Sequence, residues 1–173
     1  MKNIVKKALS ELKFAVRFDA RFLRTHFFSF FFNLVPNLYI LKWLKIFLLR
    51  MTGMKVKEIY VKSPLYVDYA KNIRIGKGTF INLGTYFDGN ALTVIGDNCQ
   101  IGPFCKFENT NHIGEEEQYL PIKIGNNVWI GANCVILPGA VISDNLTIAA
   151  GAVVRGEIKE GRVWGGVPAK MLK

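Results

Sequence analysis

The chain of 173 residues has few acidic residues, few histidines and few cysteines: 13 Asp and Glu stand against 23 Lys and Arg, with two His and three Cys. Cys99, Cys105 and Cys134 contain no C-x-x-C pair and are odd in number. This argues against a disulfide framework and against a structural zinc site. We therefore expect three reduced cysteines that act as small core residues.

Long apolar runs are also missing. A transmembrane helix needs about 20 consecutive apolar residues. In the apolar N-terminal third, the longest stretch without Lys, Arg, Asp or Glu, residues 25–41, is shorter and contains Asn33, Pro36 and Asn37. The apolar run is not directly preceded by a short basic region, and no small-residue cleavage site follows it, so no cleavable signal is expected. The sequence thus predicts a cytoplasmic protein.

The positive charge is concentrated in the first third of the chain. Residues 1–66 hold 13 Lys and Arg against 3 Asp and Glu, whereas residues 67–173 hold 10 of each. Residues 4–24 space their cations as on an amphipathic helix. A second helix is predicted from Leu38 to Met51, with Asn37 as N-cap and Gly53 just past its end.

This basic, apolar segment can be interpreted in two ways. Cations beside Phe and Trp suit the surface of an anionic membrane, which predicts peripheral contact through residues 1–51 on the inner face of the membrane. Alternatively, the two helices pack on the end of the main domain and only cap it. No nucleic-acid partner is expected.

A six-residue repeat dominates the rest of the chain. Aliphatic residues recur at every sixth position from Ile124 to Val154, and the same spacing links Ile95 to Phe107 and Ile75 to Phe87. Helices need a period near 3.6 and ordinary strands a period of 2, so a sustained period of six indicates a solenoid of short strands and tight turns. Three hexapeptides make one triangular coil.

The repeat also predicts which side chains fill the core. The aliphatic residue of each hexapeptide points inward, and so does the residue four positions later, which must be small to moderate in size. Gly and Asn supply the turn conformations at the corners. The inward residues of this second kind are Thr79, Cys99, Cys105, Val128, Cys134 and Ala140.

The stretch "IGNNVWIGANCVILPGAVISDNLTIAAGAVV", followed by "GGVPAKMLK", resembles the hexapeptide-repeat acyltransferases. The similarity is strongest to the galactoside and maltose O-acetyltransferases and to acetyltransferases of bacterial surface polysaccharides. It implies an all-β solenoid, a left-handed parallel β-helix, here with an N-terminal α-helical appendage. The expected units are residues 1–56 for the helical segment, 57–160 for the β-helix with a loop at 113–121, and 161–173 for the tail.

The repeat breaks at one of the two histidines. After Phe107 the next hexapeptide should start at Ile113, but the polar run that follows cannot enter a dry prism, and the repeat resumes only at Ile124. Residues 113–121 are therefore predicted as a loop beside His112. An imidazole can take a proton from a hydroxyl near neutral pH, and by resemblance His112 matches the family's catalytic base. Among the three neighbouring glutamates, Glu116 is our choice for the carboxylate that orients the ring.

The resemblance assigns further roles. It implies acetyl-CoA as co-substrate, a homotrimer with a cleft between subunits, a saccharide acceptor in cell-surface glycan assembly, and no metal. Asn82 would hold the acceptor, although Asn is also common at solenoid corners. Trp129 would pack beside the cleft, or else serve as a subunit contact. Expected cofactor contacts are Ala132, through its backbone N–H, with Ala150, Arg155, Lys170 and Lys173.

Three alternatives remain open at this stage. A metal-dependent hydratase of the γ-carbonic anhydrase type needs three histidines, whereas the repeats contain only His112. A non-catalytic, membrane-associated scaffold would use residues 1–56 and would not bind coenzyme A. The same chemistry could also serve an amino-sugar nitrogen or a non-sugar acceptor, since Asn90 stands where the galactoside enzymes carry an acidic residue that contacts the acceptor.

Overall fold

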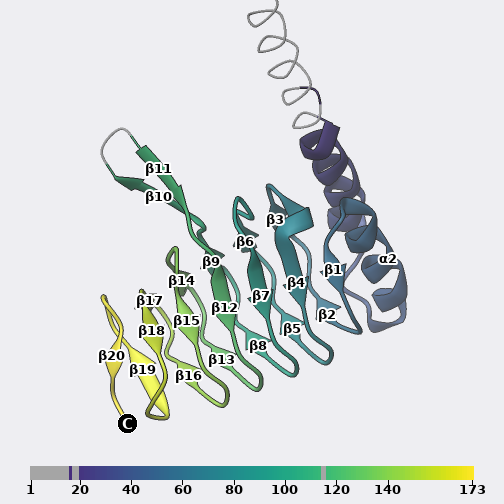
Figure 1. The fold of residues 1–173 in the computed structure, drawn as a ribbon. Helices are drawn as coiled ribbons and strands as arrows, with labels where there is room; N and C mark the ends of the chain where they lie inside the picture. Colours follow the sequence, from purple (N-terminus) through teal and green to yellow (C-terminus); the bar gives the residue numbers. More distant parts are fainter. Residues whose placement is uncertain (1–15, 17–19, 114–115) are drawn as a thin grey trace, which may run out of the picture.

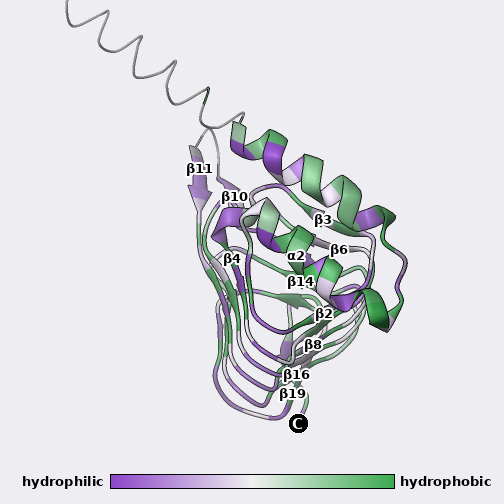
Figure 2. Ribbon diagram, turned by 90° about the vertical axis from the view of Figure 1, so that its right-hand side faces the viewer, coloured by the Kyte–Doolittle hydropathy of each residue, from purple (hydrophilic) through white to green (hydrophobic). Residues whose placement is uncertain are grey.

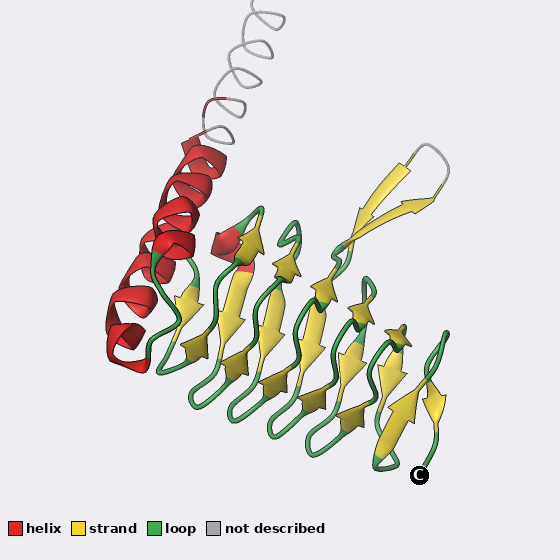
Figure 3. Cartoon of the chain, turned by 180° about the vertical axis from the view of Figure 1, so that it is seen from behind, coloured by secondary structure: helices red, strands yellow, loops and turns green. Residues whose placement is uncertain are grey.

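The computed structural model describes residue 16, residues 20–113 and residues 116–173. From Lys55 onward the chain winds into a rod of stacked coils, each with three short strands, and helices cover the N-terminal end of the rod (Figure 1). A β-hairpin projects from the middle of the rod, and no other insertion of this kind interrupts the described coils (Figure 3). The predicted parallel β-helix is therefore confirmed.

Three parallel sheets form the sides of the rod, which we call sides A, B and C in the order in which each coil visits them. Side A contains β1 (Lys55–Val56), β4 (Ile73–Ile75), β7 (Thr93–Ile95), β12 (Ile122–Ile124), β15 (Val141–Ile142) and β18 (Glu157–Ile158). Side B contains β2 (Tyr60–Val61), β5 (Phe80–Ile81), β8 (Gln100–Ile101), β13 (Trp129–Ile130), β16 (Thr147–Ile148) and β19 (Val163–Gly165). Side C contains β3 (Leu65–Val67), β6 (Thr85–Phe87), β9 (Lys106–Phe107), β14 (Val135–Ile136) and β17 (Val153–Val154).

The core is the column of side chains that the repeat predicts. The aliphatic residues at the strand ends are buried, and Phe87 and Phe107 stack with ring centroids 4.7 Å apart. The smaller inward residues are buried as well, from Thr79 to Ala140. The three thiols are free and buried, and that of Cys105 donates to Gly131 O at 3.0 Å. The cysteines are thus the small core residues that the sequence predicts.

Corner glycines allow the coils to stack closely. A Cβ atom added to Gly102 would lie 2.6 Å from the backbone nitrogen of Ala132, and one added to Gly131 would lie 2.5 Å from that of Ala150. Such distances exclude a side chain at either position. Asn127 and Asn133 take the left-handed conformation at other corner positions, with φ of 55° and 56°, a region that Asn tolerates better than most residues.

Two helices cover the first coil. Helical backbone runs from residue 20 to 34, and a 3-10 turn (Tyr39–Leu41) leads into α2 (Lys42–Thr52). Gly53 ends α2 in the left-handed conformation, as predicted. Most of the helix predicted at residues 4–24 lies outside the described residues. No helix in the described part of the chain is long and apolar enough to cross a membrane.

The prediction that Asn37 caps the second helix is wrong, because its side chain bonds to the first coil instead. Its amide donates to Ser63 O at 2.9 Å and accepts from Ser63 N–H at 2.7 Å. Asn33 holds Leu65 in the same two-way manner, at 3.1 and 2.9 Å. These amides bond to backbone groups at the exposed edge of the first coil, where unpaired strands invite association.

Lys45 of α2 ties this contact together. Its side chain is buried, with 3% exposed, and it donates to Ser63 Oγ at 2.8 Å and to Asn37 Oδ1. The ammonium also lies 5.1 Å from the centre of the Phe32 ring. The helices are therefore held to the rod by buried polar contacts together with Phe32, Ile46 and Leu49.

The C-terminal end closes on itself. β20 (Lys170–Met171) pairs antiparallel with β19, which itself continues side B. The backbone N–H of Arg162 donates to Lys173 O at 2.7 Å. Because β20 covers the last strand of side B, the final residues are part of the rod and not a free tail.

Burial of Lys45 makes stability depend on pH. Burial lowers the pKa of Lys45 to about 8, below the roughly 10.4 of an unfolded lysine. Between these values the unfolded chain holds more protons, so the free energy of unfolding should rise with pH from about 8 to about 10.5, by on the order of 1–3 kcal/mol. The hydrogen bonds of Lys45 and the Phe32 ring favour the charged ammonium and so oppose the effect of burial. We therefore expect the increase in the free energy of unfolding to lie near the lower end of this range of about 1–3 kcal/mol.

Chemical denaturation at several pH values measures this rise. Lys45→Met should lack it, whereas Lys55→Met, which removes an exposed lysine from the first coil, should keep it. Parallel pH profiles for the wild type and Lys45→Met would contradict the assignment.

Candidate functional site

The predicted loop is a β-hairpin at the corner between sides C and A. It consists of β10 (Thr110–Ile113) and β11 (Glu116–Tyr119), paired antiparallel. His112 lies directly opposite Glu117 in this pairing. Residues 114 and 115 at its tip lie outside the described residues.

A buried polar network fixes the base of the hairpin. Asn109 is fully buried, and its side chain donates to Leu120 O at 2.9 Å while its backbone oxygen accepts from Leu120 N–H at 2.9 Å. Asp88, also buried, accepts from Asn109 N–H at 3.0 Å and from Thr110 Oγ1 at 2.6 Å. Both ends of the hairpin are thereby joined to the coil beneath, which restricts where His112 can lie.

A carboxylate lies near one ring nitrogen of His112. Its Nδ1 lies 3.5 Å from Glu117 Oε1, and the imidazole side chain is 69% exposed. The hydroxyl of Tyr119 donates to the other oxygen of Glu117, which raises the pKa of Tyr119. Glu117 is thus positioned by Tyr119 and leaves His112 Nε2 available to a substrate.

The carboxylate chosen from the sequence, Glu116, has a side chain outside the described residues, and the observed contact belongs to Glu117. The register of the hairpin explains this: in an antiparallel pair, directly opposite residues share a face, and His112 is opposite Glu117. The sequence shows three consecutive glutamates but not where the turn falls.

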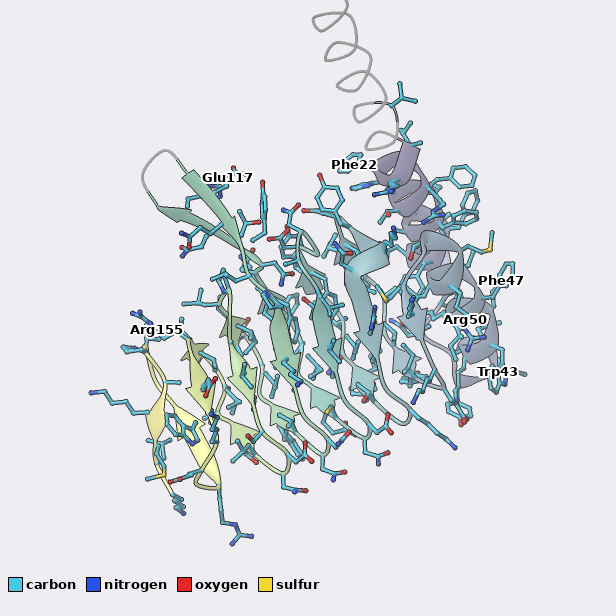
Figure 4. All side chains as sticks on the ribbon, viewed as in Figure 1. Phe22, Trp43, Phe47, Arg50, Glu117 and Arg155 are labelled. Atoms are coloured by element: carbon cyan, nitrogen blue, oxygen red, sulfur yellow. The ribbon has the colours of Figure 1, made fainter. Side chains whose placement is uncertain are left out.

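An open hollow lies between His112 and the neighbouring coils. Its volume is about 470 Å³, and Glu108, Thr110, Asn111, His112, Leu137, Pro138 and Arg155 line it. Burial and the nearby charge of Asp88 raise the pKa of Glu108. The hollow combines the imidazole of His112, the carboxyl group of Glu108 and the guanidinium of Arg155. Figure 4 shows Arg155 toward the C-terminal end of the rod and Glu117 on the hairpin. Sequence reasoning had not singled out Glu108, Asp88 or Asn109, and it had named Glu117 only as one of three candidate glutamates.

Three other predicted residues line a second hollow at the corner between sides B and C. Asn82, Trp129 and Ala132 border it together with Phe80, Gln100, Ile101, Gly102, Pro103 and Gly131, and its volume is about 250 Å³. Trp129 is 61% exposed. This hollow and the His112 hollow share no residue and lie at different corners of the rod. A single chain therefore does not bring Asn82, Trp129 and Ala132 together with His112.

Small residues continue this second corner toward the C-terminus. Ala132 O accepts from Gly151 N–H at 2.8 Å, which stacks Ala150 on Ala132, and a Cβ on Gly165 would lie 3.0 Å from that of Ala149. Within the described part of the chain, the N–H groups of Ala132 and Ala150 have no hydrogen-bond acceptor. Lys170 and Lys173 are exposed at the same end of the rod and line neither hollow. The corner therefore offers a narrow path with free backbone donors.

The described residues contain no group of three or more His, Cys, Asp or Glu that could hold a metal ion. The site as described consists of protein side chains and backbone donors at two corners of the rod.

Comparisons with known proteins agree with this architecture. A family profile of the bacterial transferase hexapeptide (six repeats) matches residues 121–156. The galactoside O-acetyltransferase of Escherichia coli (strain K12) is 38% identical over 124 residues, which cover 68% of this chain and 61% of that enzyme. The chain thus spans about three fifths of the length of that relative.

Two solved structures are similar over most of their length. The maltose O-acetyltransferase from Clostridium difficile 630 has a TM-score of 0.83 at 30% identity, covering 90% of this chain and 87% of that one. A hexapeptide-repeat acetyltransferase from Vibrio cholerae, solved with acetyl coenzyme A, has a TM-score of 0.81 at 28% identity, with the same coverage. The chain therefore belongs to the hexapeptide-repeat acyltransferases, in the group that includes the galactoside and maltose O-acetyltransferases.

Proposed function

We propose that this protein transfers the acetyl group of acetyl-CoA to a hydroxyl of a saccharide, with His112 as the general base. The observation that carries the proposal is the His112–Glu117 pair on a fixed hairpin beside an open hollow. The relatives support the donor and the acceptor class: one neighbour was solved with acetyl coenzyme A, and others are named as galactoside and maltose O-acetyltransferases.

The chemistry follows from the two nitrogens of the ring. Nδ1 faces the Glu117 carboxylate, which favours the tautomer with a proton on Nδ1 and leaves the Nε2 lone pair to accept the hydroxyl proton. The acceptor oxygen then attacks the thioester carbonyl and forms a tetrahedral oxyanion. The negative charge of Glu117 stabilises the imidazolium formed in that step. When the C–S bond breaks, the coenzyme A thiolate takes the proton back from Nε2.

A developing oxyanion needs donors that are already in place. The free N–H of Ala132 is our proposal for this role, and the small residues from Ala132 to Ala150 would leave room for the pantetheine arm. Arg155, Lys170 and Lys173 would attract the phosphates of coenzyme A. Asn82 and Trp129 would contact the acceptor.

Asn82, Trp129 and Ala132 lie at a different corner from His112, whereas Arg155 lines the His112 hollow itself. Because of this separation, we propose that the site is completed by a neighbouring copy in a homotrimer. In a closed cyclic assembly the corner between sides C and A of one copy can face the corner between sides B and C of the next, and each junction then forms one complete site. The acceptor is proposed to be a cell-surface polysaccharide or a lipid-linked glycan.

His112→Ala should lower kcat by roughly 10²–10⁴-fold, the usual contribution of a positioned general base. Release of free thiol from acetyl-CoA, with a galactoside or maltose as acceptor, measures this. His26→Ala is the matched control, because His26 is an exposed histidine of the first helix. Retained turnover in His112→Ala would refute the role of the base.

Glu117→Gln keeps the shape of the side chain and removes its charge. We expect kcat to fall about tenfold or more with KM nearly unchanged, since the carboxylate acts on the imidazolium of the transition state. Glu116→Gln is the control on the same hairpin. If Glu116→Gln has the larger effect, the original choice of Glu116 is right and Glu117 is not the orienting residue.

Mixed assemblies test the shared site. His112→Ala and Asn82→Ala should each have low turnover alone. When the two variants are unfolded and refolded together, random assembly leaves both intact residues at about a quarter of the junctions between copies. Turnover should then exceed that of either variant. No recovery, with mixed assemblies confirmed by mass, would place both residues in the site of one chain.

A further inference from the structure

We propose that the two N-terminal helices form a docking surface for an anionic lipid membrane, a role distinct from the proposed catalysis. The surface, called here the helical patch, consists of exposed apolar side chains between residues 20 and 53. They are Phe22, Leu23, Phe27, Phe30, Phe31, Leu34, Leu38, Tyr39, Ile40, Trp43, Leu44, Phe47 and Met51.

The patch is unusual in that the helices turn apolar groups outward. In α2 the inward side holds Lys45, Ile46 and Leu49, whereas Trp43 is 62% and Phe47 56% exposed. Ile40, in the turn before α2, is 84% exposed. Figure 4 shows Trp43 and Phe47 directed away from the coils, and Figure 2 shows apolar residues along both helices. Arg50 is also exposed, although its Nε donates to Val56 O of the first coil at 3.2 Å. A soluble surface rarely leaves so many large apolar groups together without a partner.

Packing on the rod is therefore not the whole account of these helices. They do pack on the rod, through Phe32, Ile46 and Leu49. The alternative in which the helices cap the end of the main domain therefore describes their inner side. Their outer side still lacks a cover in the described chain.

The charge of the segment indicates what covers it. Residues 20–57 contain seven Lys and Arg and no Asp or Glu. A second copy would bring the same positive charge, and residues 67–173 are balanced at 10 of each sign, so this chain has no acidic surplus with which to pair the patch. The partner must supply negative charge together with an apolar interior, and both are found at the surface of an anionic bilayer.

The side chains also suit the two depths of such a surface. Phe and Leu can enter the boundary of the acyl chains, and Trp43 and Tyr39 can sit at the level of the headgroups. Arg21 can reach the lipid phosphates, and so can the terminal nitrogens of Arg50, whose Nε donates to Val56 O. Because no described helix is long enough to cross the membrane, the contact would be peripheral.

The position of the patch fits the homotrimer proposed above. The helices cover one end of the rod (Figure 1). The residues that line the two hollows belong to coils farther along the rod. Three rods packed side by side would present three patches at the same end. Simultaneous contact by linked sites strengthens binding without any new contact, and it would hold the sites close to lipid-linked acceptors.

Sedimentation with vesicles tests the proposal on the full chain. The wild type should bind vesicles that contain phosphatidylglycerol, should bind pure phosphatidylcholine vesicles much less, and should release at high salt. Trp43→Ser with Phe47→Ser should weaken binding roughly tenfold or more, because two large apolar side chains are lost from the contact. Val167→Ser with Leu172→Ser removes two exposed apolar residues at the other end of the rod and should leave binding unchanged.

A second pair of variants tests the charge. Arg21→Gln with Arg50→Gln should weaken binding to the anionic vesicles roughly 30-fold, from about 1 kcal/mol for each of the two charges, whereas Lys123→Gln with Arg162→Gln should have little effect. Thiol release with a soluble acceptor should be the same in all four double variants, which confirms folding and separates this test from the proposed catalysis.

Three results would overturn the proposal. The first is no binding of the wild type to anionic vesicles, and the second is binding that the Trp43 and Phe47 substitutions do not reduce. The third is an assembly whose mass falls in the same variant, because the patch would then be an interface between copies of the chain.

Discussion

The narrowness of the prism decides how the rest of this protein is built. Each side admits one aliphatic residue and one smaller residue per hexapeptide, and stacked coils approach so closely at Gly102 and Gly131 that no side chain fits there. Such a core is dry and continuous, so it cannot hold a substrate or polar catalytic groups. Polar function must lie on the corners or on segments that leave the coil, which is where the hairpin with His112 and both hollows are found.

The same constraint explains why the site is divided. A corner is convex and open, so a single rod cannot enclose a substrate or exclude water from it. The hairpin supplies one wall beside His112, and its base is held by Asn109 and Asp88. Asn82, Trp129 and Ala132, proposed for the acceptor and the oxyanion, lie at another corner. A neighbouring copy would provide the missing wall, which makes assembly and catalysis parts of one proposal.

The ends of the rod present a different problem, because a stack of strands exposes unpaired backbone at each end. At the C-terminus β20 turns back onto β19. At the N-terminus Asn33 and Asn37 take the place of a partner strand, and Lys45 donates to Asn37 and Ser63. This contact occupies only the inner side of the helices, and the outer side remains available to a membrane.

By itself the sequence determined the β-helix, its core residues and the interruption of the repeat, because a six-residue period is a local property of one stretch of chain. It placed the loop at 113–121 beside His112, whereas the hairpin starts at Thr110 and includes His112. It also determined that His112 stands at the break. Only the tertiary structure showed that Glu117 contacts His112, since that depends on where a turn falls within a run of glutamates. It also decided that Asn37 bonds to Ser63 instead of capping a helix, and that His112 and Asn82 lie at different corners, because these relations join residues far apart in the chain through the stacking of coils.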